Sequence, residues 1–333
     1  MSLACIAAPV VRRAAAATAA GILALTLGAC SSDSGSGGPV SDIKVGSSPG
    51  LSGIGLRVAV SEGNFAERGL TVTPTANKSA NDAVPQLLNG GLHVAQMDTI
   101  TLMQARSQGL PIRVIAGAGL QSTDGEDGEL SAASVVSAPS SPIKSVRDLV
   151  GKKVGVPAIK TQTWMNIRAI VDRAGGDSAA IEFVEVPPAQ TIDLVQQGFV
   201  DAATPNEPLA SSAISSGKAQ LVHNTDVPGN KGVPSSVYVA SEQFIAENPE
   251  AVQKFAEGIY EAAASVNGNT ELAEKVAREQ LGFSPEQLEN AYVQTFAAEP
   301  VTAEQLDKIA TLAVEYEILT EKPAADELLA ESE

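Results

Sequence analysis

The chain has 333 residues, enough for two domains with cores of their own. Its formal net charge of -17 argues against nucleic-acid binding, because no basic surface would replace phosphate counterions. Its two cysteines, Cys5 and Cys30, precede the predicted globular part, and its two histidines are His93 and His223. We therefore expect no cysteine or histidine metal cluster, no Ser-His-Asp triad and no cofactor.

The first 29 residues have the features of an export signal. Arg12 and Arg13 supply a positive start, and the apolar stretch after them is shorter than the roughly 20 residues that span a bilayer. Leu27-Gly28-Ala29-Cys30 resembles a bacterial lipobox, in which the cysteine is diacylated. An ordinary signal peptide is the alternative. We predict a signal peptide over 1–29, lipidation of Cys30, and a flexible Ser- and Gly-rich tether over 30–42.

Strands and short helices alternate from Ile43 to Ala118, and a loop of small residues follows the first strand. This alternation is typical of βαβ units and a mostly parallel sheet. Strands are predicted at 43–48, 70–75, 92–97 and 112–118, with helices at 51–61, 80–89 and 99–108 between them.

A second round of the alternation begins near Ser145. Ser145 is a favourable N-cap, and Asp148 lies in the first turn, so a short helix is predicted over 145–150. A strand at 153–156 then ends in a turn that feeds a helix from about Thr163. Such a turn leaves free backbone N–H groups at the sheet edge where α/β proteins bind ligands.

The remaining elements continue this pattern and end in a helical region. We expect the stretches 132–137 and 233–240 to cross between two domains, helices from Ser241 to about Leu319, and a frayed acidic tail at 322–333. Strands are predicted at 181–186, 199–204 and 220–223, and helices at 163–174, 189–197 and 208–216.

Two fragments recur in the same order. Lys44-Val45-Gly46 returns as Lys153-Val154-Gly155, and the pattern of residues 87–95 returns at 194–202. Chance similarity in a chain rich in Ala, Gly and Val is the alternative to two similar α/β lobes. We predict that lobe one comprises 43–134 and 237–333, and that lobe two comprises 135–236.

Several motifs occur in one order along the chain. They are the lipobox, Gly63-x-Phe65-x-x-x-Gly69-Leu70-x-Val72, Ser141-Pro142-Ile143-x-Ser145-x-x-Asp148-Leu149-x-Gly151-Lys152-Lys153-Val154, Gly198-x-x-Asp201-Ala202-x-x-x-x-Glu207-Pro208 and Phe244-x-x-x-Asn248-Pro249. In these motifs and their order the chain resembles the substrate-binding components of ABC importers, in the group that handles nitrate, sulfonates including taurine, and thiamine-type pyrimidine precursors. The resemblance implies a type II periplasmic-binding-protein fold, in which two α/β lobes joined by two crossing strands close on a ligand.

The function implied by this resemblance is that of an exported receptor. It would be a monomer anchored by lipid to the outer face of the cytoplasmic membrane. It would capture a small organic solute between its lobes and deliver it to an ABC permease with a cytoplasmic ATPase, without being an enzyme. One alternative is a biosynthetic enzyme on the same fold, acting on a pyrimidine-like or carboxylate substrate. A sensory or scaffolding lipoprotein is a third possibility.

Strand-to-helix turns are where this architecture binds ligands. Thr161, Thr163 and Asp98 have the alternative role of helix caps, Trp164 could belong to the core, and Glu207 stands where a helix dipole favours it anyway. His93 is expected to be structural, His223 to lie at the surface, and Lys78 to be solvated. The predicted ligand-binding residues are Ser47, Ser48, Asn77, Asp98 and Thr99 in lobe one, and Thr161, Thr163, Trp164, Asn206 and Glu207 in lobe two.

The ligand is left open between two chemical classes. Backbone donors near Thr163 favour a sulfonate or carboxylate. The group of Asp98, Glu207 and Trp164 would instead suit a flat heterocycle that carries an amine.

Overall fold

Two five-stranded sheets organise the part of the chain that the structure, a computed structural model, describes. This part comprises residues 40–77, 80–125 and 128–330, all within the compact unit Pro39–Glu333. The predicted signal peptide, Cys30, most of the tether and Lys78 lie outside the described residues.

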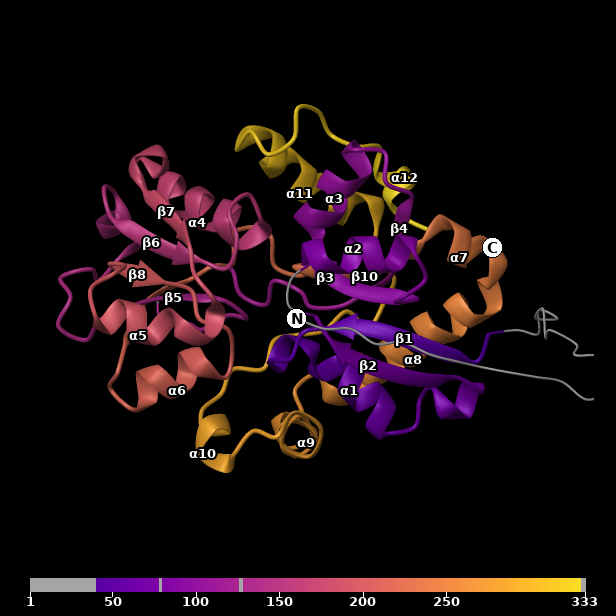
Figure 1. The fold of residues 1–333 in the computed structure, drawn as a ribbon. Helices are drawn as coiled ribbons and strands as arrows, with labels where there is room; N and C mark the ends of the chain where they lie inside the picture. The colour runs from indigo at the N-terminus through magenta and orange to yellow at the C-terminus, as the bar shows by residue number, and fades with distance from the viewer. Residues whose placement is uncertain (1–39, 78–79, 126–127, 331–333) are drawn as a thin grey trace, which may run out of the picture. The chain divides into compact units, whose positions relative to one another are not determined.

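The first sheet has the strand order β2-β1-β3-β10-β4. β1 pairs in parallel with β2 and β3, whereas β10 is antiparallel to both of its neighbours. We call this sheet and the helices against it lobe one. Its strands are β1 (Asp42–Ser47), β2 (Thr71–Ala76), β3 (Val94–Asp98), β4 (Ile112–Gly117) and β10 (Ser236–Ser241) (Figure 1).

The second sheet repeats this arrangement in the order β7-β6-β8-β5-β9, and we call it and its helices lobe two. β6 is parallel to β7 and β8, and β5 is antiparallel to β8 and β9. The antiparallel strand of each sheet therefore comes from a stretch where the chain passes from one sheet to the other. The strands are β5 (Ser134–Ser137), β6 (Lys153–Val156), β7 (Glu182–Glu185), β8 (Ala202–Ala203) and β9 (Gln220–Asn224).

The recurring sequence fragments occupy equivalent places in the two sheets. Lys44-Val45-Gly46 lies in β1 and Lys153-Val154-Gly155 in β6, each next to the edge strand of its sheet. Gly46 pairs with Ala95 on β3, and Gly155 pairs with Ala203 on β8. The prediction of two mixed α/β lobes is confirmed. The exact lobe limits at 134/135 and 236/237 stay a prediction.

Helices cover both sheets, the N-cap predicted at Ser145 is present, and side chains cap other helices as well. Ser145 and Asp148 form a capping box on the short helix Val146–Leu149, and the side chains of Ser241 and Thr302 accept bonds from the helices that they precede. No helix in the described ranges combines the length and apolar character needed to cross a bilayer. The helices are α1 (Ile54–Ser61), α2 (Ala80–Leu88), α3 (Thr99–Ser107), α4 (Gln162–Arg173), α5 (Thr191–Gln196), α6 (Leu209–Ser215), α7 (Glu242–Glu247), α8 (Pro249–Val266), α9 (Thr270–Val276), α10 (Pro285–Leu288), α11 (Ala303–Glu315) and α12 (Ala325–Leu328).

The region after Ser241 is not helical throughout, and this corrects the sequence prediction. Residues 289–302 form no helix because their backbone pairs with distant parts of the chain. The Tyr292 N–H donates to Ser211 Oγ, and the Leu120 N–H donates to the Thr295 carbonyl. A pattern read along the chain does not reveal these non-local partners.

Two smaller predictions are also corrected. The strand expected at 199–204 is only Ala202–Ala203, and Phe199 is 58% exposed with Lys153 above its ring. His223 is buried in β9 rather than lying at the surface.

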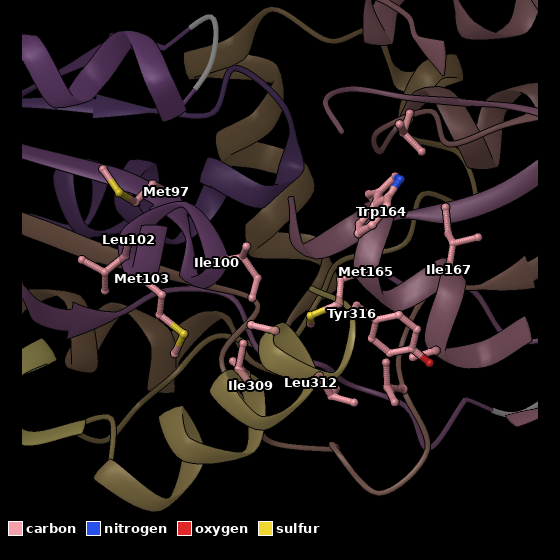
Figure 2. Packing of buried hydrophobic residues seen from close by; sticks show 14 of the residues in the cluster. Met97, Ile100, Leu102, Met103, Trp164, Met165, Ile167, Ile309, Leu312 and Tyr316 are labelled. Atoms are coloured by element: carbon pink, nitrogen blue, oxygen red, sulfur yellow. The ribbon is translucent and has the colours of Figure 1, made fainter. Parts of the chain in front are cut away.

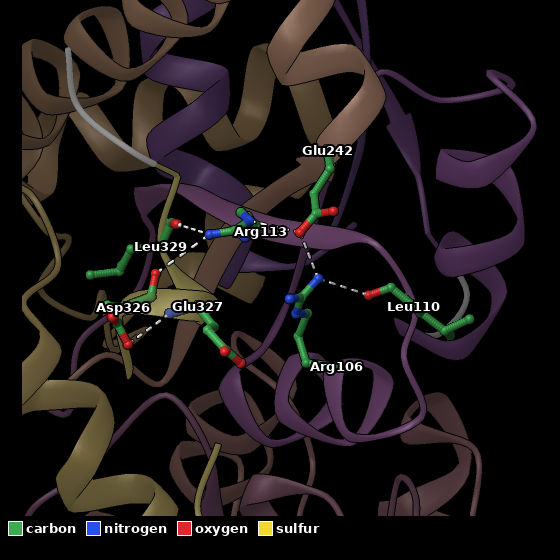
Figure 3. A network of polar contacts seen from close by, with 7 residues as sticks. All are labelled: Arg106, Leu110, Arg113, Glu242, Asp326, Glu327 and Leu329. Atoms are coloured by element: carbon green, nitrogen blue, oxygen red, sulfur yellow. Dashed lines mark hydrogen bonds and ion pairs between the residues drawn. The ribbon is translucent and has the colours of Figure 1, made fainter. Parts of the chain in front are cut away.

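The tail is held by the first lobe instead of being frayed. Leu328 is fully buried, and Leu329 forms a bridge with Val114 on β4. The Arg113 guanidinium donates to the Leu329 carbonyl at 3.1 Å and to Glu242 Oε1 at 2.7 Å (Figure 3). Arg106 also donates to Glu242 Oε1, and these arginine contacts, with the Arg113 hydrogen bond foremost, lower the pKa of Glu242.

A single hydrophobic cluster contains residues from both lobes. It includes Ile100 on α3, Met165 on α4 and Ile309 on α11 (Figure 2). α11 contacts both α3 and α4, so α11 packs where the two lobes meet. The Tyr316 hydroxyl at the end of α11 adds a polar contact by donating to Asp172 Oδ2 at 3.0 Å.

Arg113→Ala should destabilise the fold, because the Leu329 carbonyl loses its donor and Glu242 loses one of its two arginine donors. We expect a loss of about 1–2 kcal/mol, since the pair is only partly buried. The melting temperature should fall by about 2–4 °C per kcal/mol in a chain of this size. Lys254→Ala, which breaks the exposed helical pair with Glu250, is the control and should cost about 0.5 kcal/mol or less. Equal effects of the two substitutions in thermal unfolding would contradict the role of Arg113.

Candidate functional site

Four segments from distant parts of the chain line a small cavity between the lobes. They are the loop after β1, the residues just before β5, the start of α6 and the non-helical segment near the C-terminus. The space is about 10 Å³, enough for the centre of one water molecule. The lining residues are Leu51, Ser52, Ala132, Glu207, Tyr292 and Gln294.

The loop from lobe one is held in a tight conformation by polar contacts. Ser48 Oγ accepts bonds from the Gly50 N–H and from Ser52 Oγ, and Gln96 bonds both the Ser48 N–H and the Ser52 carbonyl. A Cβ at Gly53 would lie 2.3 Å from the Ser48 carbonyl oxygen, so only glycine permits this turn. Ser52 is thereby fixed at the cavity wall.

Glu207 supplies an incompletely paired carboxyl group from lobe two. Its side chain is 5% exposed, and Oε1 accepts a 2.9 Å bond from Ser211 Oγ on α6. Oε2 is buried and has no hydrogen-bond partner. Burial raises the pKa of Glu207 to about 7, against the opposing effect of the Ser211 hydrogen bond.

The C-terminal segment closes the third side of the cavity. The Tyr292 N–H donates to Ser211 Oγ at 3.3 Å, which links this segment to the serine beside Glu207. Gln294 is buried, and its Nε2 has no hydrogen-bond partner. Two residues that line one space therefore each carry a buried polar atom without a partner, one a donor and one an acceptor.

The loop of lobe one touches lobe two directly at this place. The Leu51 N–H donates to the Glu207 carbonyl at 3.2 Å. A Cβ at Gly50 would come within 2.9 Å of the same oxygen. The backbone of the two lobes is thus in contact beside the cavity.

A second polar contact between the lobes centres on Asp98. This residue caps α3, and its Oδ1 accepts bonds from the Thr101 N–H at 3.0 Å and from the Gln162 N–H at 3.3 Å. Asp98 therefore lies at the N-termini of both α3 and α4, where helix dipoles favour a negative charge. Burial nevertheless raises the pKa of Asp98, although these hydrogen bonds oppose the shift.

The predicted site residues divide between these two places. Glu207 lines the cavity, and Ser48 bonds Ser52 on its wall, with Ser47 and Asn77 next to that loop. Asp98, Thr99 and Thr161 lie at the second contact. Asn206 is exposed and Thr163 half-buried. The contacts that place them are the bond from Asn77 N–H to the Ser47 carbonyl, the bond from Thr99 Oγ1 to the Pro234 carbonyl, and the position of Thr161 as the N-cap of α4.

Trp164 lies in the hydrophobic cluster rather than at the cavity (Figure 2). It is 8% exposed, its ring packs against Phe183 at 5.6 Å between centroids, and the Arg168 guanidinium lies 4.9 Å from its ring centroid. These contacts favour the core role. Contact between Trp164 and a ligand stays a prediction.

Sequence reasoning missed much of the cavity wall. Ser52 could have been found, because it belongs to the same small-residue loop as Ser48. Tyr292 and Gln294 carried no signal, since the segment was expected to be helical. No group of three or more His, Cys, Asp or Glu residues in the described ranges is arranged to hold a metal ion. The predicted ligand roles remain predictions.

Comparison with known proteins gives the family. Residues 52–273, two thirds of the chain, match the family described as NMT1/THI5 like. The chain belongs to the NMT1/THI5 like family. The match contains the cavity loop from Ser52 onward and Glu207, but it ends before Tyr292 and Gln294.

Two curated relatives of this NMT1/THI5 like protein are binding proteins by name. The taurine-binding periplasmic protein of Escherichia coli (strain K12) is 28% identical over 208 residues, which cover 62% of this chain and 61% of that protein. A putative binding protein of Brucella abortus (strain 2308) is 29% identical over 168 residues, covering 50% and 51%. The chain thus matches between half and two thirds of the length of these relatives.

Solved structures show the fold. The alkanesulfonate-binding protein SsuA of Xanthomonas axonopodis pv. citri, bound to MOPS, has a TM-score of 0.73 at 16% identity and covers 89% of this chain and 100% of that one. The nitrate-binding protein NrtA of Synechocystis PCC 6803 has a TM-score of 0.63 at 14% identity, covering 86% and 84%. The predicted periplasmic-binding-protein fold is confirmed.

Glu207 should make stability depend on pH. A carboxyl group with a pKa of about 7 in the fold and 4.5 when unfolded binds an extra proton in the native state between these values. The free energy of unfolding should therefore fall as the pH rises from 4.5 to 7, by about 3 kcal/mol at most from this group. Glu207→Gln keeps an acceptor for Ser211 and should remove this part of the slope in urea unfolding.

The exposed Glu271→Gln serves as the control and should keep the wild-type dependence on pH. The difference between the two variants matters, because other carboxyl groups titrate in the same range. An identical slope in wild type and Glu207→Gln would contradict the raised pKa.

Proposed function

We propose that this NMT1/THI5 like chain is the lipid-anchored, extracytoplasmic substrate-binding component of an ABC importer. It takes up a small organic solute between its lobes and presents it to a permease that works with an ATPase. The protein acts as a monomer and not as an enzyme. The fold and the names of the relatives support this function.

The observation that carries the proposal is the pair of unpaired polar atoms at the interlobe cavity. Glu207 Oε2 and Gln294 Nε2 are both buried without partners, and such groups are costly unless something completes their hydrogen bonds. A ligand that enters as the lobes move apart would supply these partners. A cavity of one-water size also means that the lobes must separate to admit any larger solute.

The site supports a solute with an amine and an acidic group. An ammonium or N–H group on the ligand would bond Glu207 Oε2, and Gln294 Nε2 would donate to an oxygen. The named ligands of the relatives agree with this chemistry, since taurine is an amino sulfonate and MOPS is a sulfonate with a tertiary amine. A pyrimidine-type heterocycle with an exocyclic amine is the alternative ligand.

Glu207 is also the observation that favours an enzyme as the second candidate. A buried carboxyl group with a pKa of about 7 suits general acid–base chemistry at neutral pH. Turnover of a bound amine or pyrimidine, lost in Glu207→Gln while binding is retained, would favour the enzyme over the receptor.

Taurine, ethanesulfonate, nitrate and a 4-aminopyrimidine form the panel that tests the proposed ligand classes. A true ligand at 100 times its Kd should stabilise the protein by about 2.7 kcal/mol, visible as a higher melting temperature. Glu207→Gln should weaken binding of taurine about 10-fold or more, because the amine loses a charged acceptor, and should change ethanesulfonate binding little. Gln197→Ala, at an exposed position of lobe two outside the predicted ligand site, is the control.

Stabilisation by the whole panel in equal measure would contradict a selective receptor. So would a taurine affinity that is the same in wild type and Glu207→Gln. The first outcome points to a general solvent effect, and the second removes Glu207 from the ligand site.

The lipid anchor is supported by the lipobox and is tested separately from the ligand. Cys30→Ser should abolish incorporation of a labelled fatty acid and release the protein from the membrane fraction. Cys5→Ser removes the other cysteine and leaves the lipobox intact, so this control should stay labelled and membrane-bound. Unchanged labelling of Cys30→Ser would contradict the anchor.

A further inference from the structure

Arg57 is a buried cation near the start of α1, next to the loop that contributes Ser52 to the cavity wall. Its side chain is 8% exposed. Nη2 donates to Ser47 Oγ at 3.3 Å, and Nε is buried without a hydrogen-bond partner. The guanidinium of Arg57 thus donates to a neutral hydroxyl group.

No carboxylate among the described residues forms an ion pair with Arg57. Burial lowers the pKa of Arg57, and Tyr238 on β10 opposes this shift. Burial also raises the pKa of the Tyr238 phenol, which keeps that group neutral. A buried cation without a counter-charge costs several kcal/mol in stability, and hydrophobic residues of similar size replace such groups without loss. A contribution to stability therefore does not explain why Arg57 is found at this buried position.

The position of Arg57 connects its charge with the proposed ligand site. Ser47, which the guanidinium contacts, precedes Ser48, and Ser48 Oγ accepts a bond from Ser52 at the cavity wall. Ser52 lies five residues before Arg57, in the short turn Leu51–Gly53 that leads into α1. Glu207 faces the same cavity from lobe two.

We propose that Arg57 is a positioning residue that selects the charge of the ligand. Its buried guanidinium makes the electrostatic potential positive at the Ser48–Ser52 wall and so favours a ligand with an anionic group on the lobe-one side. This inference rests on the proposed function. The ligand supplies the missing counter-charge, while Ser48 and Ser52 make the direct contacts.

A comparison of two probes of equal shape measures this effect. Ethanesulfonate is an anion, and ethanesulfonamide is its neutral counterpart. Interaction with one charge in a partly buried site is worth about 10- to 50-fold in affinity. The full-length wild-type protein should prefer ethanesulfonate by about that factor in calorimetric titration, and Arg57→Met should lose the preference.

The melting temperature of the ligand-free protein distinguishes a role of Arg57 in ligand selection from a role in stability. Arg57→Met removes a buried unpaired charge, so its melting temperature should be unchanged or higher. Arg57→Lys should restore most of the preference for the anion. Arg68→Met removes an arginine that pairs with Glu261 on the surface of lobe one, and this control should keep the wild-type preference.

The contradicting outcomes are separate from those of the proposed function. An anion preference that persists in Arg57→Met, or wild-type protein that binds both probes equally, overturns the role of Arg57 while leaving a receptor intact. If Arg57→Met does not fold, Arg57→Gln, which can still donate to Ser47, takes its place, and a persisting preference there has the same meaning. Wild-type protein that binds no solute of any charge contradicts the proposed function itself.

Discussion

The exchange of one strand between the two sheets is the constraint on which the rest of the structure depends. β10 completes the first sheet after the chain has built the second, and β5 enters the second sheet directly after the first. Each lobe is therefore finished by a strand that also connects it to its partner. Because the exchanged strands lie inside their sheets, the segments that lead to them are fixed, and the carboxyl ends of β1, β3 and β6 come to the interface between the lobes.

The interface between the lobes combines apolar packing with polar groups whose hydrogen bonds are incomplete. Ile100, Met165 and Ile309 join the lobes through side chains that need no partner. At the cavity, by contrast, Glu207 and Gln294 are buried with one atom unpaired each. Stability alone disfavours such groups. Under the proposed function they are explained, since a solute bound between the lobes would complete their hydrogen bonds and shift the balance between open and closed lobes.

The electrostatics of the site follow from burial more than from ion pairs. Glu207, Asp98 and Arg57 all have pKa values shifted towards their neutral forms by desolvation, and none of the three is matched by an opposite charge within the described protein. Under the proposed function, a small polar ligand would supply groups complementary to these side chains, and the acidic net charge of the whole chain would not decide the preference of the site.

Patterns of neighbouring residues were enough to predict much of this protein's fold from the sequence alone. The alternation of strands and helices, the repeated Lys-Val-Gly fragment and the cap at Ser145 depend on neighbouring residues, so local patterns were enough to predict two α/β lobes. Ser48 and Glu207 could be proposed because they lie in strand-to-helix turns. Only the tertiary structure decided that Tyr292 and Gln294 leave the helical pattern, that Trp164 packs in the core and that Arg57 stands behind the cavity loop. Those positions depend on partners far away in the chain, and no local periodicity carries that information.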